Sequence, residues 1–524
     1  MGKSLIRFII SSFKEISPKQ NIKSLGTNIR GDILAGITVA IIALPMALAF
    51  GEMSGLGPIA GVWGAIAGGI VGGLFGGCMV GVSGPTAPKA AQISLFIGSG
   101  AIISTTPNLD FSAAFSIIFL SGLILVIISM LKISRFIHYT PYPVIAGFMC
   151  GIGVIVVFTQ INAFLGLPPE EDIHAVFRNF KTIIQSVKIE ALYVSVPSLL
   201  ILFLWSPVSQ KIKFLKKIPS PLVALIIGTG IAYYMNQVHA IELLTIKQDM
   251  GDLIKPENNI LDNISFYVPD FSKIFTFIGP AMALAGLAVL DSLLSCKVAD
   301  NMTGTRHSSD RETFGQGMAN MAAGLFGGVT TATATMRTVA NIKFGGKTPL
   351  ASIIHGITLL AILLALSSEV GEIPKACLAA ILFKVGIDIL DYRILPVLRK
   401  LPIIDLLIFI VVLFVTVYAD LLIAVAIGII FACLRYFKEL KAKYNHQISS
   451  FSKSNLYLDR QDVKKIDQLP VSVLKPNGPL FFGSVESLIN TYKNAPKHET
   501  LIIDMDSVTM IDLSGAYALE DLIK

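Results

Sequence analysis

GGLFGG at residues 72–77 returns as AGLFGG at residues 323–328, and AGITVA at 35–40 matches AGLAVL at 285–290 at almost the same offset. These matches divide the chain into two halves of about seven apolar spans each, and an odd number of spans inverts the second half relative to the first. Inverted repeats of this kind are typical of secondary transporters. The alternative is a chance likeness between glycine-rich helices, which pack closely in any membrane protein.

The composition places the chain in a membrane. Hydrophobic residues make up 53% of its 524 residues and charged residues only 15%, against about 25% charged in soluble domains. Apolar blocks of about 20 residues, the length that crosses a bilayer as a helix, recur from Gly31 to about Phe437. We count about 14 of them. The sequence therefore predicts an all-α membrane domain over residues 31–437 with about 14 spans in a seven-plus-seven inverted repeat.

The distribution of charge predicts the orientation. The tail at 1–30 has six basic residues and one acid, Glu15, and basic segments stay in the cytoplasm. The segment from Glu242 to Asp270 is acidic and is expected outside. An even number of spans returns the basic region around Lys438 to the cytoplasm, so we expect an inner-membrane protein with both termini inside. Contact with cytoplasmic lipid explains the net charge of +7, and no nucleic-acid partner is needed.

Both copies of the repeated phrase lead into runs of small and hydroxylated residues, VGVSGPTAPKAA at 80–91 and VTTATATMRTVA at 329–340. Pro85 and Pro88 disfavour a continuous helix, so a half-helix should begin near them. The free N–H groups at such a start attract an anion, and neighbouring hydroxyls can complete its hydrogen bonds. The hydroxyls are those of Ser83, Thr86, Thr333 and Thr335. In an inverted repeat the two starts face each other near the middle of the membrane.

Three charged side chains within the spans need an explanation, because burying them in a bilayer is costly. Asp291 has Ser295 one turn later on the same helix face, and such oxygen ligands suit a small cation. A structural pair between Asp291 and Arg337 or Lys89 is the alternative. Arg337 either holds the anion or neutralises Asp291, and the role of Lys89 is equally open. His355 is interpreted as a packing residue.

Three stretches carry a family resemblance: GDILAGITVAIIALPMALAFGEMSGLGPIAG, VSGPTAPKAA and LDSLLSCKVADNMTGTRHSSDRETFGQGMANMAAGLFGG. They resemble the SulP family of inorganic anion transporters, over nearly the whole chain. The resemblance implies a core and a gate domain, an elevator-like movement of the core, and a homodimer. Within the family the chain is most similar to the sodium-dependent bicarbonate transporters of cyanobacterial type.

The resemblance also implies site residues. The sodium site is carried over to Asp291, Ser295, Thr333, Ala334 and Thr335. For the anion site the resemblance implies Phe50, Thr86, Ala334 and Thr335. The residues argued above, Ser83 and Arg337, complete the predicted anion site. Sodium serves as the coupling ion, and no other cofactor is expected.

Two positions depart from patterns in the family. Met46 stands where many relatives that are thought to be proton-coupled have a glutamate; a thioether cannot relay a proton, which favours sodium. Arg337 is typical of the wider family, whereas the bicarbonate branch has a small residue there. This second departure leaves the identity of the anion open.

The C-terminal segment is of another kind. A linker at 438–470 precedes LIIDMDSVTMIDLSGAYALEDLIK, which predicts a buried strand, a turn and a helix beginning near Ser514. Residues 471–524 are similar to part of a STAS domain, a small α/β fold, and are expected to be truncated because the full fold needs more elements. This segment is a candidate for binding a cytoplasmic regulator. Ser514 is expected as a helix N-cap; the alternative is the counterpart of a serine phosphorylated in related domains.

These observations predict a secondary active transporter of a small inorganic oxyanion, with sodium-coupled bicarbonate symport as the first hypothesis. A sulfate or dicarboxylate carrier, proton-coupled or exchanging, is the alternative. A nucleobase permease would lack the STAS-like tail, and a channel or signalling platform would leave Asp291 and Ser295 without a purpose. The sequence shows no nucleophile–base pair or phosphate loop, so we expect no enzyme and no catalytic residues.

Overall fold

A computed structural model describes residues 15–98, 111–134, 142–168, 173–209, 218–239, 241–248, 266–390 and 402–418, a few single positions, and most of 471–523. The segments expected as the last span, near 421–437, and as the linker at 438–470 lie outside the described residues, apart from single positions.

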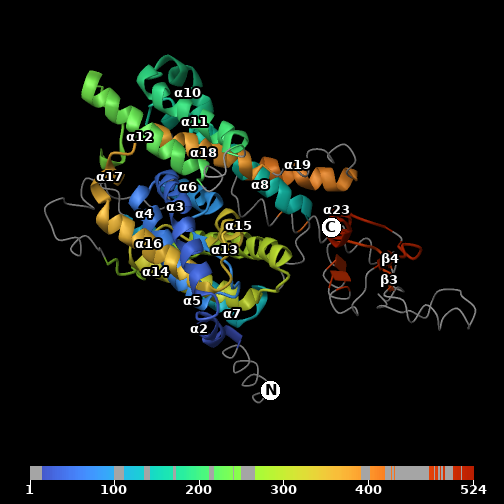
Figure 1. Ribbon diagram of the computed structural model, residues 1–524. Coiled ribbons are helices and arrows are strands. Elements are labelled where there is room, and N and C mark those ends of the chain that lie inside the picture. Colours follow the sequence, from blue (N-terminus) through green and yellow to red (C-terminus); the bar gives the residue numbers. More distant parts are fainter. Residues whose placement is uncertain are drawn as a thin grey trace, which may run out of the picture. The chain divides into compact units, whose positions relative to one another are not determined.

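In the described residues of the first half, the regular structure consists of helices and one short strand (Figure 1). Its elements are α2 (Lys19–Ser24), α3 (Ile29–Met53), α4 (Pro58–Ala67), the π-helix η1 (Gly68–Gly72), α5 (Gly73–Phe75), β1 (Ser83–Gly84), α6 (Ala87–Gly98), α7 (Phe111–Met130), α8 (Tyr142–Thr159), α9 (Ile161–Phe164), α10 (Ile173–Gln185), α11 (Ile189–Ser209) and α12 (Ser220–His239).

The second half repeats this pattern. Its elements are η4 (Ile246–Gln248), α13 (Ile274–Thr303), α14 (Ser309–Leu325), β2 (Ala332–Thr333), α15 (Thr335–Lys343), α16 (Pro349–Ala365), α17 (Ser367–Gly371), α18 (Lys375–Ile389) and α19 (Ile403–Tyr418). The C-terminal segment adds β3 (Val471–Leu474), β4 (Thr500–Ile503) and α23 (Leu513–Ile523).

Six helices in the described part of the chain are long and apolar enough to cross a bilayer, and the bent pair α10–α11 brings the count to seven. Two shorter apolar helices, α16 and α19, add to these. The protein is thus a multi-pass membrane protein with an all-α membrane domain, as predicted. The count of about 14 spans stays a prediction, because the described residues do not cover every apolar block.

The two halves interleave. Within the compact unit formed by Met1–Arg135 and Ile152–Leu390, blue α3 packs against orange α16 (Figure 1). In the same unit α7 packs against α14 from the other half (Figure 1). Glycine permits the second contact. A Cβ on Gly122 of α7 would lie 2.6 Å from the carbonyl oxygen of Gly317 of α14, and a Cβ on Gly317 would lie 2.8 Å from the carbonyl oxygen of Gly122. Any side chain at either position would separate the helices, so these glycines set their distance.

The two copies of the glycine-rich phrase lead to the same place. After α5 and after α14 the chain is extended, and β1 pairs with β2 in antiparallel fashion, Ser83 opposite Thr333 and Gly84 opposite Ala332. We call these two short strands the crossing. Helices α6 and α15 begin just after it, so the expected meeting of two half-helix starts is confirmed. The π-helix η1, which α5 follows, packs on β1.

The chain forms two compact units, Met1–Arg135 with Ile152–Leu390, and Phe136–Gly151 with Asp391–Lys524. In the second unit β3 pairs in parallel with β4, which precedes α23 as predicted. Two details were wrong. Strand β4 is not buried, since Thr500 and Ile502 are exposed and, among the described residues, it pairs with β3 alone.

The second correction concerns the start of α23. The helix begins at Leu513, and the carboxylate of Asp512 caps it by accepting the Gly515 N–H at 2.7 Å. Ser514 is therefore not the N-cap; its hydroxyl accepts the N–H of Tyr142 at 3.2 Å. Aspartate caps a helix as well as serine does, so the cap lies two residues before the one expected.

A buried carboxylate joins the first turn of α3 to the start of α16. Asp32 is fully buried and accepts the N–H groups of Lys347 and Thr348, the Thr348 hydroxyl and the Asn28 side-chain amide, at 2.6–3.2 Å. The two halves are thereby tied at one end of the core helices.

We expect Asp32→Ala to lower the free energy of unfolding by about 1–3 kcal/mol, because it leaves buried N–H groups without an acceptor. The measurement is the thermal unfolding midpoint of the detergent-solubilised protein. Asp388→Asn is the control, since this exposed carboxylate on α18 contacts Lys384 one turn away. Equal midpoints for the two variants would contradict the role of Asp32.

Candidate functional site

The crossing places two helix N-termini side by side. The Ala334 N–H donates to the Val82 carbonyl at 3.0 Å, and the Val82 N–H donates to the Thr338 hydroxyl at 3.1 Å. Each half thus supplies hydrogen-bond partners to backbone groups of the other half. Positive ends of helix dipoles attract anions, so the geometry suits an anion held between α6 and α15.

One side of the crossing carries oxygen atoms suited to a cation. Asp291 of α13 is half-buried, and Ser295, one turn later, is fully buried with its hydroxyl 2.7 Å from the Thr335 hydroxyl. The Thr86 hydroxyl lies near the Asp291 carboxylate. Oδ2 of Asp291 and Oγ1 of Thr86 are both buried without a hydrogen-bond partner among the described residues. Such unpaired oxygen atoms are costly in a dry site, and a bound cation would satisfy them.

The Arg337 guanidinium supplies positive charge and hydrogen-bond donors, which suit an anion rather than a cation. Its side chain is 1% exposed and lies against Gly84 of β1. Nη1 and Nη2 have no hydrogen-bond partner in the described part of the chain, and Asp291 acts on the charge from beyond ion-pair distance. A buried guanidinium with unpaired donors fits an anion. The structure therefore favours the anion-holding interpretation of Arg337 over a direct pair with Asp291.

Lys89 differs from Arg337 in having a partner. The ammonium in the first turn of α6 is fully buried and donates to the Thr331 carbonyl, just before β2. It is also near enough to Asp291 to act on that carboxylate electrostatically. Lys89 thus joins the two halves and adds positive charge beside the crossing.

The remaining predicted residues lie at or near the crossing but differ in burial and in hydrogen-bond partners. The hydroxyls of Ser83 and Thr333 are buried and 3.3 Å apart, and both already have partners on α14. Ala334 is the N-cap of α15, and Thr335 is exposed at its first position. Phe50 is buried in α3, a helix that packs on both α6 and α15.

Sequence reasoning missed three residues of α14. Glu312, Gln316 and Asn320 are almost fully buried, and all three bond to the crossing or to the chain just before it. A signal was present, because polar residues at positions i, i+4 and i+8 line one helix face. Ser292, whose hydroxyl accepts the Thr333 N–H at 3.2 Å, was also missed.

The fold and this site define a multi-pass membrane protein in which two inverted halves meet at a crossing whose geometry suits an anion. Residues 29–412 match the Sulfate permease family, and residues 460–524 match the STAS domain. The chain belongs to the Sulfate permease family, also called SulP, and is an anion transporter. The resemblance to the SulP family that the sequence showed is thereby confirmed. The relatives of this chain are transporters rather than enzymes.

The chain is similar to several known proteins. It is 33% identical to the bicarbonate transporter BicA of Picosynechococcus, over 95% of this chain and 86% of that protein. It is 31% identical to the putative sulfate transporter YvdB of Bacillus subtilis, over 94% and 88%. The solved transmembrane domain of a cyanobacterial BicA matches with a TM-score of 0.66 at 32% identity, over 76% of this chain and 97% of that structure.

The position of Arg337 depends on the missing side chain at residue 84. A Cβ on Gly84 would fall on Nη1 of Arg337. We expect Gly84→Ala to displace the guanidinium and to raise the anion concentration for half-maximal uptake severalfold, since overpacking a buried site costs about 1–3 kcal/mol. Uptake by proteoliposomes measures this. Gly279→Ala on α13 meets nothing within 4 Å and serves as the control; equal uptake curves would contradict the assignment.

Proposed function

We propose that the protein carries bicarbonate together with sodium across the inner membrane by an elevator-like movement of its core helices. The observation that carries this proposal is the balance of buried charge around the crossing. The proposal includes cytoplasmic termini, a homodimer and a STAS segment that binds a cytoplasmic regulator, as the family resemblance implies.

Among the described residues, we consider four ionisable side chains that touch or electrostatically reach the crossing. Lys89 and Arg337 are basic, and Asp291 and Glu312 are acidic. When all four are ionised their charges cancel. A sodium ion with bicarbonate adds no net charge to this site, whereas bicarbonate alone, or sulfate with one sodium ion, leaves an uncompensated negative charge. Uncompensated charge in a low-dielectric interior is costly, so the neutral pair is the cargo that the site favours.

The two ions also have separate partners. Oxygen atoms of Asp291, Ser295 and Thr335 lie on the α13 side of the crossing, and carboxylate and hydroxyl oxygens are ligands that hard cations prefer. The Arg337 donors and the N-terminus of α6 suit the anion. Attraction between the two bound ions adds to the binding of each, which is the physical basis for coupling their transport.

The relatives support the choice of anion in part. BicA is named a bicarbonate transporter, and its identity to this chain is similar to that of YvdB, named a putative sulfate transporter. Sulfate or a dicarboxylate, proton-coupled or exchanged, is therefore the second candidate. The unpaired Arg337 guanidinium favours it, because a fixed positive charge attracts a divalent anion more strongly than a monovalent one.

The test is uptake of labelled bicarbonate and of labelled sulfate by proteoliposomes, with and without a sodium gradient. We expect sodium to stimulate bicarbonate uptake in the wild type and Asp291→Asn to abolish that stimulation, because the amide keeps the shape of the side chain but not its charge. Size-exclusion profiles check that the variant remains folded. Wild-type sodium stimulation in Asp291→Asn would contradict the cation site, and sulfate uptake alone would favour the second candidate.

Arg337→Gln should separate the two anions by their charge. Coulomb energy scales with the product of the charges, so losing the guanidinium should cost a divalent anion about twice the free energy that it costs bicarbonate. The variant should therefore raise the half-saturating sulfate concentration by a factor that is about the square of the factor by which it raises the half-saturating bicarbonate concentration. Concentration series for both anions measure this. An equal factor for the two would mean that Arg337 acts through packing.

A further inference from the structure

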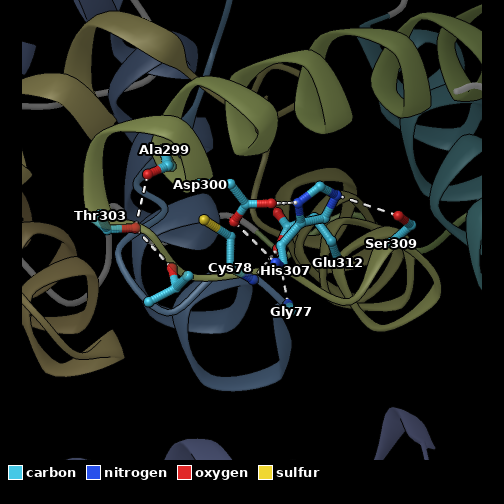
Figure 2. Close-up of polar contacts among 9 residues, drawn as sticks. Gly77, Cys78, Ala299, Asp300, Thr303, His307, Ser309 and Glu312 are labelled. Carbon is cyan, nitrogen blue, oxygen red and sulfur yellow. Dashed lines mark hydrogen bonds and ion pairs between the residues drawn. The ribbon is translucent and has the colours of Figure 1, made fainter. Parts of the chain in front are cut away.

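Glu312 of α14 lies where both extended segments approach the crossing. Oε2 accepts the N–H groups of Gly77 and Cys78 at 2.8 and 2.9 Å, as Figure 2 shows for the loop after α5. Oε1 accepts the Thr333 hydroxyl of β2 and the Gln316 side-chain amide. One buried carboxylate therefore contacts the loop of the first half and the strand of the second.

Gln316 and Asn320 extend this contact along the same helix face. The Gln316 amide donates to Ser83 Oγ at 2.7 Å and to Thr333 Oγ1 at 2.9 Å, so it joins the two strands of the crossing. Asn320 accepts the Thr331 N–H at 2.7 Å and donates to the Thr331 carbonyl at 2.9 Å. Both strands are thus held against one rigid helix by side chains one turn apart.

The crossing needs such support because it is short. Each strand has two residues, and the segments 76–82 and 326–331 that lead into it belong to no helix or strand. The N-termini of α6 and α15 follow within a few residues on either side. A shift of either strand on α14 therefore moves a helix N-terminus, Thr86 or Thr335 relative to the cargo.

We propose that Glu312 is a positioning residue for anion transport: it fixes the two half-helix starts at the distance that binds the anion, without contacting the anion itself. Gln316 transmits this effect to Ser83 and Thr333. The proposal requires only that the chain is an anion transporter, so it holds for bicarbonate and for sulfate alike.

The nearby side chains of Figure 2 have another role. His307 donates from its backbone N–H to Asp300 Oδ1 at 2.9 Å, and its Nδ1 lies 2.7 Å from Oδ2, while Nε2 lies 3.2 Å from the Ser309 hydroxyl. These bonds close the turn between α13 and α14. They hold the first turn of α14, which contains Glu312, but none of them reaches the crossing.

Glu312→Gln tests the proposal. An amide presents one acceptor and one N–H₂ group to surroundings that are nearly all donors: two backbone N–H groups, a hydroxyl and the Gln316 amide. The Thr333 hydroxyl can turn to accept, but an amide whose oxygen keeps the loop N–H groups points its own N–H₂ group at the N–H₂ group of Gln316. The bonds to the loop and to Gln316 therefore cannot both persist. We expect the anion concentration for half-maximal uptake to rise on the order of tenfold, with a smaller change in the maximal rate, measured in proteoliposomes with whichever labelled anion the wild type transports.

The exchange of the two side chains provides the rescue. In Glu312→Gln with Gln316→Glu, the amide at 312 accepts from the loop and donates to the carboxylate at 316, which accepts the hydroxyls of Ser83 and Thr333. The loop N–H groups, the amide at 312 and the two hydroxyls then each have a hydrogen-bond partner, and the site keeps one buried negative charge. We expect this double variant to return the half-saturation concentration towards the wild-type value. Asp388→Asn, which also removes one carboxylate, is the matched control.

Each result decides the proposal. An unchanged half-saturation concentration in Glu312→Gln overturns it. A raised concentration that the double variant fails to restore also overturns it, because transport would then require a carboxylate at position 312 itself rather than the hydrogen bonds between the two segments. Glu312→Asp replaces the single variant if that variant does not insert: it keeps the charge but is one methylene too short to reach both the loop and Thr333. Wild-type half-saturation in Glu312→Asp would equally overturn the proposal.

Discussion

The antiparallel pairing of β1 with β2 is the contact on which the rest of the membrane domain depends. A chain that leaves the helical conformation inside a bilayer exposes N–H and carbonyl groups that lipid cannot satisfy. Here each half supplies the partners for the other half, Ser83 opposite Thr333 and Gly84 opposite Ala332. This solution is possible only because the two halves are inverted, which brings their extended segments together in opposite directions.

Glycine makes the crossing compact enough to work. The reciprocal approach of Gly122 and Gly317 brings α7 onto α14, and α14 then presents Glu312, Gln316 and Asn320 to the extended segments. At Gly84 the absence of a side chain leaves room for the Arg337 guanidinium. Within the repeated phrase, a Cβ on Gly77 would meet the Ser308 carbonyl oxygen, and a Cβ on Gly324 would lie 2.7 Å from the Phe115 carbonyl oxygen. The phrase that appears twice in the sequence is thus a packing requirement.

Charge and hydrogen bonding divide the crossing into two layers. Glu312, Gln316, Ser83 and Thr333 satisfy one another, so their polar atoms are occupied within the protein. Asp291 Oδ2, Thr86 Oγ1 and both terminal nitrogens of Arg337 are buried without a partner among the described residues. The first layer therefore fixes geometry, and the second is left available for ions. A transporter needs both, because unpaired groups bind cargo only if the backbone around them is held in place.

The sequence by itself determined the membrane class, the inverted repeat and the place of the half-helix starts, because apolar block length, an odd span number and paired prolines act locally or by simple symmetry. It also identified Asp291, Ser295, Thr335 and Arg337 as a group. It could not determine that the Thr333 and Ser83 hydroxyls bond to α14, or that Glu312 joins both halves, because these contacts connect residues 17 to 235 positions apart. Nor could it show that Asp512 rather than Ser514 caps α23, since two nearby residues of equal capping strength differ only in the backbone geometry that packing imposes. Local chemistry decides which elements form, whereas the choice of partner for each buried polar atom depends on which elements the fold brings together.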